Sequence, residues 1–310
     1  MQKTRLNVKN EFLTKLQTIV AAPRLLVNEP MARHTTFQIG GPADVLVLPS
    51  SAQEVAAVWK TAVDFGVPVI ALGNGSNVLV LDGGIRGLVL KMGETMSHIR
   101  QVGTTVIAGS GAVLGDVARF AARSGLTGLE FAVGIPGSIG GAVFMNAGAY
   151  DGEIGNLVAA VTAVCPQSRL KRFTHTEIRF SYRHSIFQDN GCIICEVELC
   201  LKEGENGAIE HKMGDYTCRR EAKQPIEMPS AGSTFKRPPG FFAGTLIEET
   251  GLKGLRIGGA QVSHKHAGFI INVGGAKAAD VLALIGEIQR RVFEKFNVRL
   301  QPEVQILGEE

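Results

Sequence analysis

Two glycine-rich segments of this sequence have the composition that binds phosphate groups. The first, GNGSN at 73–77, directly follows the apolar run VPVIAL, and the second is GIPGSIGGAVFMNAG at 134–148. Glycine lets backbone N–H groups approach an anionic oxygen that any Cβ would hold away, and several such donors can converge on a diphosphate. The two segments together predict a nucleotide cofactor, although each could serve only as a tight turn between strands.

The first segment does not have the spacing of a Rossmann dinucleotide-binding unit. In that unit G-x-G-x-x-G opens a helix, whereas the residues after the first segment, VLV at 78–80, favour a strand. A loop at the carboxyl end of a strand is nevertheless a usual place for a ligand. The pattern therefore favours a nucleotide site in a fold of another kind.

Basic and histidine side chains of the C-terminal third form two further candidate clusters. Arg220 and Lys223 are three residues apart in a predicted helix, so both cations can face one anion; a solvated helix surface is the alternative. His264 and His266 would share one face of a strand, but no acidic or thiol third ligand lies nearby in the sequence. We therefore expect no metal, and interpret His266 as a contact of a substrate or of the nucleotide cofactor.

The five cysteines do not form a metal motif. Cys192 and Cys195 make a single C-x-x-C in a β-like run, where positions three apart point to opposite faces, and no second such pair exists. We expect the cysteines to be reduced, buried thiols of a cytosolic protein.

Periodicity places these residues on an alternation of helices and strands. Apolar stripes predict helices over about 10–20, 53–65 and 276–296, and the polar cluster at 202–207 is typical of a domain boundary. In the closing run NVRLQPEVQIL, alternate apolar residues share one parity, so Glu303 points to the other face. The sequence thus predicts an α+β protein.

Composition limits the class of protein. A chain of 310 residues suggests about two domains, and 45% apolar with 20% charged residues is typical of a globular protein. A net charge of +3 with scattered basic residues does not indicate nucleic-acid binding. The charged N-terminus is unlike a signal peptide, and the uncharged stretch at 131–150 is broken by Pro136 and glycines, so we expect a cytoplasmic protein without a membrane span.

Seven ordered segments resemble one family, the UDP-N-acetylenolpyruvoylglucosamine reductases, which are flavoproteins of bacterial cell-wall precursor synthesis. The segments are TTFQIGGPAD, LGNGSNVLV, GLEFAVGIPGSIGGAVFMNAGAY, FSYRHSIF, AGSTFKRP, LKGLRIGGAQVSHKHAGFIIN and PEVQILG. They cover nearly the whole chain from about residue 28. The short region after FSYRHSIF is similar to the compact subtype, which lacks an inserted tyrosine loop.

The resemblance implies an α+β fold with a FAD-binding domain of the vanillyl-alcohol-oxidase (PCMH) type. That domain would span 28–202 in two lobes, about 28–92 and 93–202, after a helical extension at 1–27 and before a substrate-binding domain at 203–310. FAD would bind non-covalently, with NADPH as co-substrate. The implied cofactor contacts are Gly73, Asn74, Gly75, Ser76, Asn77, Gly134, Ile135, Pro136, Gly137, Ser138, Gly140, Gly141, Asn146, Ala147 and Gly148.

The implied reaction reduces the enolpyruvyl ether of a UDP-sugar to UDP-N-acetylmuramate. Three positions match the family's catalytic set: Ser233 as proton donor, Arg183 as partner of the substrate carboxylate, and Glu303 as a group that orients or polarises it. The substrate contacts implied or suggested are Tyr150, Arg220, Lys223, Lys236 and His266. Without the resemblance, each of the three catalytic candidates has an ordinary interpretation. Ser233 could be a turn residue, Arg183 a surface arginine and Glu303 a solvated glutamate.

Two other functions stay open on the sequence. A related flavin oxidase of alcohols or lactones could use the same cofactor half, and a non-catalytic nucleotide-binding module would need neither flavin nor Ser233. The chain also departs from the family's usual pattern at Arg237, where asparagine is common after the lysine of the serine loop. No protein partner is indicated.

Overall fold

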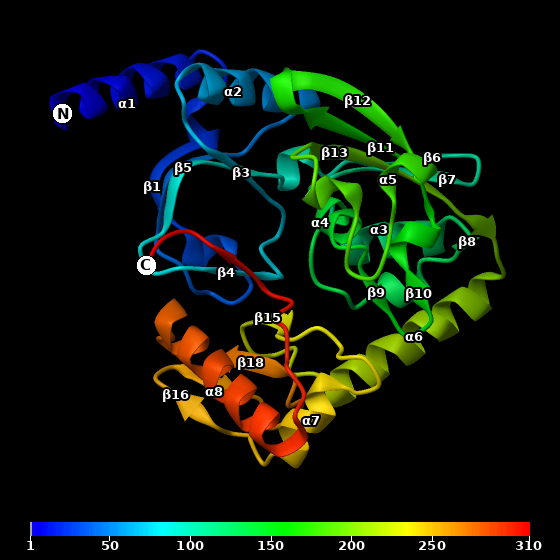
Figure 1. Cartoon of the computed structure of the whole chain (residues 1–310). Helices are drawn as coiled ribbons and strands as arrows, with labels where there is room; N and C mark the ends of the chain where they lie inside the picture. The colour runs from blue at the N-terminus through cyan, green and yellow to red at the C-terminus, as the bar shows by residue number, and fades with distance from the viewer. Residues whose placement is uncertain (1) are drawn as a thin grey trace. The chain divides into compact units, whose positions relative to one another are not determined.

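The chain is divided into two units (Figure 1). The computed structural model describes residues 2–310, with side chains from Asn10 onward. Unit 1 consists of the chain up to Asn28, Val45–Asn74 and Gly87–Thr217. Unit 2 consists of Glu29–Asp44, Gly75–Arg86 and Cys218–Glu310. None of the described helices combines the length and apolar character that a membrane crossing needs.

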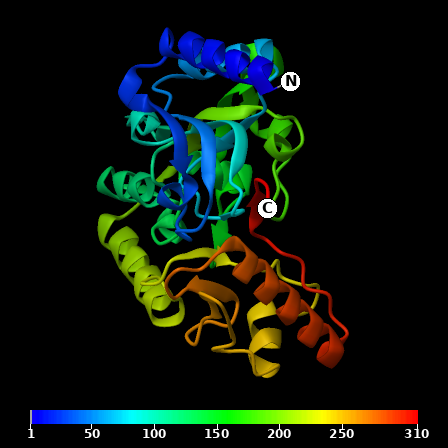
Figure 2. The ribbon, with the colours of Figure 1, turned by 90° about the vertical axis from the view of Figure 1, so that its left-hand side faces the viewer.

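The N-terminal elements pack helices on a four-stranded sheet. Helix α1 (Gln2–Gln17) ends three residues before the expected position, whereas α2 (Ala52–Asp64) lies within one residue of its prediction. The strands have the order β1-β2-β5-β3, with bounds Leu25–Pro30, Pro42–Val47, Ile85–Lys91 and Val69–Leu72, and appear side by side in blue to cyan in Figure 2. Buried residues of α2, such as Val55 and Val58, share a core with Leu88 and Leu90 of β5.

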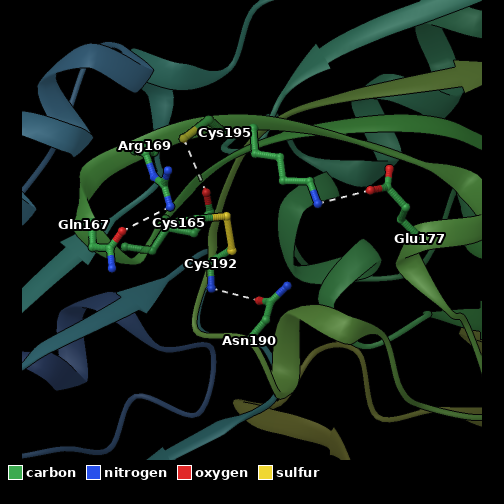
Figure 3. The surroundings of a disulfide bond; sticks show 9 residues. Cys165, Gln167, Arg169, Glu177, Asn190, Cys192 and Cys195 are labelled. Carbon is green, nitrogen blue, oxygen red and sulfur yellow. Dashed lines mark hydrogen bonds and ion pairs between the residues drawn. A yellow bond between two sulfur atoms is a disulfide. The ribbon is translucent and has the colours of Figure 1, made fainter.

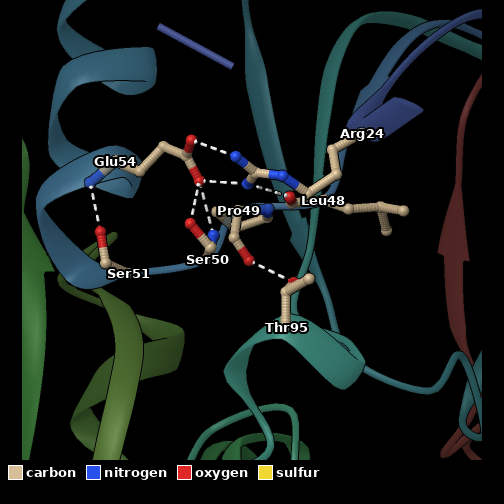
Figure 4. Close-up of polar contacts among 7 residues, drawn as sticks. All are labelled: Arg24, Leu48, Pro49, Ser50, Ser51, Glu54 and Thr95. Atoms are coloured by element: carbon tan, nitrogen blue, oxygen red, sulfur yellow. Dashed lines mark hydrogen bonds and ion pairs between the residues drawn. The ribbon is translucent and has the colours of Figure 1, made fainter. Parts of the chain in front are cut away.

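An ion pair fixes the start of α2 beside the end of β2. Arg24 donates from Nη1 and Nη2 to the two carboxylate oxygens of Glu54, at 2.5 and 2.8 Å, and also to the carbonyl of Leu48 (Figure 4). Ser51 caps the helix, because its Oγ accepts the N–H of Glu54 at 3.1 Å. Two parallel hydrogen bonds to a half-buried carboxylate make this contact more specific than a surface ion pair.

The second sheet of unit 1 is antiparallel and has five strands. Its order is β12-β11-β13-β7-β6, with bounds Arg169–Thr174, Val158–Cys165, Ile193–Cys200, Thr105–Gly109 and Ile99–Val102. Helices α3 (Leu114–Arg123) and α4 (Ile139–Phe144) bury residues in one core with the sheet. The other face contributes Val164 and Cys195 to the core under α2. Both faces of β11 and β13 are therefore covered at this end.

Short elements complete unit 1. Strand β8 (Leu126–Thr127) pairs with β14 (Lys202–Glu203), β9 (Gly148–Ala149) pairs with β10 (Gly152–Glu153), and α5 (His175–Ile178) follows β12. Helix α6 (Asn206–Lys223) belongs to unit 1 up to Thr217 and to unit 2 from Cys218.

Unit 2 places two helices on a four-stranded antiparallel sheet. The strand order is β15-β18-β17-β16, with bounds Ser230–Ser233, Phe269–Asn272, Ala260–Val262 and Arg256–Ile257, and the helices are α7 (Ala243–Glu249) and α8 (Ala278–Phe296). The predicted apolar stripe of α8 is buried in this core. A separate parallel pair joins β4 (Val78–Val80) to β19 (Gln305–Leu307).

The structure corrects the prediction for four of the cysteines, because Cys200 and Cys218 are exposed and Cys165 and Cys192 are not free thiols. Cys165 and Cys192 form a disulfide bond, 27 residues apart in the sequence, whereas the sequence predicts reduced thiols. The reason lies in strand pairing: Val164 of β11 is opposite Ile193 of β13, so the residues next to them also face each other. The expectation that Cys192 and Cys195 point to opposite faces is confirmed, because they belong to different cores.

Candidate active site

The two glycine-rich segments meet in unit 1 where β3 ends and α4 begins. A Cβ built on Gly73 would lie 2.3 Å from Oγ of Ser138, a distance that real Cβ atoms do not adopt. Ser138 in turn caps α4, since its Oγ accepts the N–H of Gly141 at 3.3 Å. Only glycine at position 73 allows this approach, so the segments that the sequence singled out separately form one surface.

A third glycine-flanked turn, missed in the sequence, lies against the same surface. Ser110 stands between Gly109 and Gly111, and its carbonyl accepts the N–H of Gly140 at 2.9 Å. A Cβ on Gly140 would approach Cβ of Ser110 to 2.7 Å. The Oγ of Ser110 is buried and has no hydrogen-bond partner among the described residues. The triplet GSG was the available signal.

These features fit a flavin cofactor. A buried hydroxyl without a partner is costly in a folded protein, and a ligand with several acceptor oxygens would satisfy it. Gly73 and Gly140 must be glycines because Ser138 and Ser110 lie where their Cβ atoms would be, and the N–H groups of Gly140 and Gly141 already bind protein oxygens. The unpaired hydroxyl of Ser110 is therefore the feature of this surface that fits a cofactor with several acceptor oxygens.

The next part of the second segment is braced by Asn146. This residue is buried, has φ of +44°, and uses both ends of its amide: Nδ2 donates to the carbonyl of Ser181 at 2.9 Å, and Oδ1 accepts the N–H of Gly155 at 2.9 Å. Asparagine tolerates the left-handed region better than most residues. In this structure its side chain joins the glycine-rich segment to the loop that carries Arg183.

Arg183 lies beside the end of the glycine-rich segment. Its Nη2 donates to the carbonyl of Gly148 at 3.3 Å, and its guanidinium stands 5.2 Å from the centre of the Tyr182 ring. The residue has φ of +56° in a tight turn closed by Ser181 and His184, and Gln188 donates to its carbonyl at 3.0 Å. A non-glycine residue in this region is strained, which marks a position that the surrounding structure fixes.

Tyr150 closes the glycine-rich segment with an aromatic stack. Its ring lies parallel to that of Tyr216 on α6, with centroids 4.3 Å apart, and its Oη donates to the carbonyl of Tyr216 at 2.9 Å. The residue is 44% exposed and has φ of +54°. The ring of Tyr216 therefore covers one face of the Tyr150 ring.

Gly75, Ser76 and Asn77 of GNGSN belong to unit 2, where Asn77 contacts the catalytic candidate Glu303. Gly75 has φ of +64°, and a Cβ there would lie 2.3 Å from the carbonyl oxygen of His34. Asn77 donates from Nδ2 to the carbonyl of Glu303 at 3.2 Å, and its own carbonyl accepts the N–H of Gln305 at 2.9 Å. The loop and the C-terminal segment are thus held together by hydrogen bonds.

Ser233 and Glu303 lie on neighbouring extended segments of unit 2. Glu303 donates its N–H to the carbonyl of Thr234 at 2.8 Å, and Lys236 donates its N–H to the carbonyl of Gln301 at 2.8 Å. Ser233 is exposed at the end of β15 and pairs with Phe269 of β18. The structure therefore brings Ser233 and Lys236 close to Glu303, which lies about 70 residues further along the sequence. Arg183 belongs to unit 1.

His266 is held in a turn beside α7. Its Nδ1 accepts the N–H of Gly268 at 3.0 Å, and its ring meets Phe269 edge-on at 5.1 Å. Burial lowers the pKa of His266 below its usual value. The ring is accordingly neutral at pH 7, with its proton on Nε2, and can donate one hydrogen bond.

The other basic candidates lie at the end of α6. Arg220 is half-buried and Lys223 is exposed, both in the last helical turn. Within the described part of the chain, no three His, Cys, Asp or Glu side chains cluster as metal ligands would. His264 and His266 are not part of such a cluster.

Comparison with known proteins identifies the family. A model described as "FAD binding domain" matches residues 43–174, and one described as "UDP-N-acetylenolpyruvoylglucosamine reductase, C-terminal domain" matches residues 224–307. A Clostridium perfringens (strain SM101 / Type A) protein named UDP-N-acetylenolpyruvoylglucosamine reductase is 48% identical over 303 residues, which are 98% of this chain and 99% of that relative. The chain belongs to the UDP-N-acetylenolpyruvoylglucosamine reductase family. It is a FAD-containing oxidoreductase, as the sequence resemblance implied.

Solved structures agree with this family and with its fold. The UDP-N-acetylenolpyruvylglucosamine reductase of Thermus caldophilus matches with a TM-score of 0.79 at 37% identity, over 92% of this chain and 98% of that one. An alkyldihydroxyacetonephosphate synthase matches with a TM-score of 0.50 at 18% identity, over 62% of this chain and 40% of that one, and thus shares only the fold. The predicted α+β, PCMH-type architecture is confirmed, and it is followed by a C-terminal domain of the reductase family.

Proposed function

We propose that this chain reduces the enolpyruvyl ether of UDP-N-acetylglucosamine-enolpyruvate to UDP-N-acetylmuramate, with NADPH as the reductant. The observation that carries the proposal is 48% identity to a named reductase over 98% of the chain. The packed glycine surface around Ser138 and Ser110 supports it, because it suits the cofactor that this reaction needs.

Ser233 is proposed to supply the proton. FAD held by the glycine-rich segments would supply hydride that derives from NADPH. Addition of hydride to the enolpyruvyl group would leave negative charge on the carbon beside the substrate carboxylate. A serine hydroxyl is too weak an acid to react with the vinyl ether beforehand, yet it can protonate a strongly basic carbon. The exposed position of Ser233, after Gly232 with φ of +74°, leaves its hydroxyl accessible to substrate.

Glu303 and Arg183 are proposed to act on the substrate carboxylate. A guanidinium can hold a carboxylate through two parallel hydrogen bonds and stabilise charge that develops there. Glu303 would orient the same group. Tyr150, Arg220, Lys223, Lys236 and His266 are proposed to contact the rest of the UDP-sugar.

We propose a separate role for each of three consecutive parts of the chain. Residues 28–202 would bind FAD through the glycine-rich segments, residues 203–310 would bind substrate, and residues 1–27 would form a helical extension. We place the reaction in the cytoplasm, where NADPH and nucleotide sugars are made, without an obligate protein partner.

Product analysis tests this function. Purified protein incubated with NADPH and the enolpyruvyl UDP-sugar should yield a product heavier by two hydrogen atoms, with one NADPH consumed per product. Oxygen uptake with an alcohol or lactone, and none of this product, would instead indicate a flavin oxidase. Protein that purifies without flavin and does not bind added FAD would contradict both enzymatic assignments.

A further inference from the structure

A surface cavity of about 320 Å³ opens beside the disulfide bond, apart from the residues assigned to the reaction. Its lining consists of Cys165, Pro166, Arg169, Leu170 and Lys171. Figure 3 shows the disulfide with Arg169 and Gln167 close to the Cys165 end. The cavity is large enough for a small organic molecule.

Strand pairing explains why two cations and a sulfur atom share this surface. Cys165 is directly opposite Arg169 in the hairpin of β11 and β12, and directly opposed residues project to the same face. Lys171, two residues further along β12, projects to that face as well. The connection is a tight turn in which Gln167 and Ser168 have φ of +68° and +60°.

The two cysteines of the disulfide differ in exposure. Cys165 is half-buried and lines the cavity, whereas Cys192 is 8% exposed and packs in the main core of unit 1. Its N–H donates to Oδ1 of Asn190 at 2.9 Å, which fixes the start of β13 (Figure 3). A thiolate from solvent therefore reaches Cys165 first, and Cys192 is the leaving group.

The nearby free thiol is not suited to exchange with this bond. Cys195 is buried in the other core, where its Sγ donates to the carbonyl of Ile193, and burial raises the pKa of Cys195 to about 12. A thiol in this state supplies almost no thiolate at neutral pH. An external thiol is thus the reactant that the site admits.

The charge around the cavity selects among external thiols. Arg169 is exposed and donates to Oε1 of Gln167 at 3.1 Å. Lys171 pairs with Glu177 at 3.0 Å and stands 4.3 Å from the centre of the Phe173 ring. Two cations against this one carboxylate leave the rim positive, which favours an anionic reactant.

We propose that the Cys165–Cys192 disulfide is a reversible modification site for small anionic thiols, which the Arg169 and Lys171 rim directs to Cys165. The thiolate forms a bond to Sγ of Cys165 while the Cys165–Cys192 bond breaks, and Cys192 leaves as a thiolate that takes a proton from water. A second thiolate then attacks the attached sulfur, which releases Cys165 as a thiolate and forms an external disulfide. Two thiols are oxidised and the protein disulfide is reduced.

The segment between the two cysteines gives this modification a structural consequence. The disulfide closes a loop that contains β12, α5 and the turn with Arg183. Reduction removes the covalent tie between the ends of this segment. The modification itself does not depend on the proposed reaction, so it is testable by itself.

Rates of exchange with thiols of different charge test the proposal. The intact protein is treated at low ionic strength with thioglycolate, 2-mercaptoethanol or cysteamine, at equal thiolate concentrations, and quenched with N-ethylmaleimide for peptide mapping. The Arg169→Gln/Lys171→Gln variant should react more slowly with the thiolate of 2-mercaptoethanol, which carries one negative charge, by about threefold for each cation removed, because a unit charge about 6 Å away contributes about 0.7 kcal/mol in water. The thiolate of thioglycolate carries a second negative charge on its carboxylate and should be slowed more. The thiolate of cysteamine is neutral overall because of its ammonium group and should change least.

A matched control removes two arginines elsewhere. Arg119→Gln/Arg123→Gln changes the net charge equally on α3, whose ribbon lies apart from β12 in Figure 1, and should keep the wild-type order of rates. The early adduct should map to Cys165, with N-ethylmaleimide on Cys192. An adduct on Cys192, equal charge dependence in both double variants, or no exchange in the folded protein would overturn the proposal.

Discussion

Backbone hydrogen bonds set the positions of Ser233 and Glu303. The N–H of Glu303 binds the carbonyl next to Ser233, and Asn77 holds the carbonyl of Glu303. Such placement is insensitive to changes in the serine side chain. Substitution at position 233 should therefore remove chemistry and leave the fold intact.

The Ser233→Ala variant separates proton delivery from flavin reduction. We expect NADPH to reduce its flavin at the wild-type rate, and the enolpyruvyl UDP-sugar to reoxidise it more slowly by about 10² or more, because the proton donor is absent. Stopped-flow absorbance measures both steps. Ser230→Ala, in the same strand, should leave both rates near wild type, and equal slowing of the two steps in Ser233→Ala would argue against a proton donor.

His266 makes the stability of the fold depend on pH. Burial lowers its pKa in the folded state, whereas the unfolded chain regains a value of about 6.5. Between the folded value and about 6.5 the unfolded state binds more protons, so stability is full above this range and falls as the pH falls. Denaturant unfolding between pH 7.5 and 5.5 should show this loss, at most about 1.4 kcal/mol per pH unit.

The His266→Asn variant is the comparison for that titration. Its Oδ1 can still accept the N–H of Gly268, but the side chain does not ionise. We expect a smaller loss of stability on acidification than in the wild-type protein. An identical pH dependence in the two proteins would show that His266 is not the source.

At the scale of elements, the contact between β3 and α4 tests the cofactor surface. Gly73→Ala would place a methyl group 2.3 Å from Oγ of Ser138 and force the two segments apart. We expect FAD affinity to fall by about tenfold or more, measured by quenching of FAD fluorescence on binding. Gly93→Ala is the control, because nothing lies within 4 Å of the position that its methyl group would take, and it should bind FAD normally.

The disulfide should stabilise unit 1 through its loop. Closing 27 residues reduces the entropy of the unfolded chain by an amount equivalent to about 3.5 kcal/mol. The Cys165→Ser/Cys192→Ser variant should lose stability of this order in denaturant titrations without reductant. Cys200→Ser, at an exposed free cysteine, should match the wild-type protein. A double variant as stable as wild type would show that the bond does not constrain the unfolded chain.

The sequence predicted those elements whose pattern is local. The stripe along α8 was found because Val281, Ile285 and Val292 recur with the period of a helix, and all three are buried. Ile306 shares the parity of the buried Val304 yet is 46% exposed, because β19 belongs to a two-stranded pair and not to a covered sheet. The disulfide escaped prediction since it depends on the register of β11 and β13, which no local pattern records.

At the scale of the whole molecule, family membership supplied what local patterns could not. Ser233 and Glu303 are adjacent only because distant segments pair, and Ser110 is significant only beside Gly140. Spacing alone could identify the glycine-rich segments but not a proton donor. The 48% identity to a named reductase, over 98% of the chain, is what combined these residues in one hypothesis.

An anaerobic titration in two steps tests the central claim most directly. NADPH should bleach the visible flavin absorption of the purified protein, and the enolpyruvyl UDP-sugar should then restore it with one equivalent of UDP-N-acetylmuramate formed. Flavin that NADPH reduces but that this UDP-sugar fails to reoxidise would contradict the account.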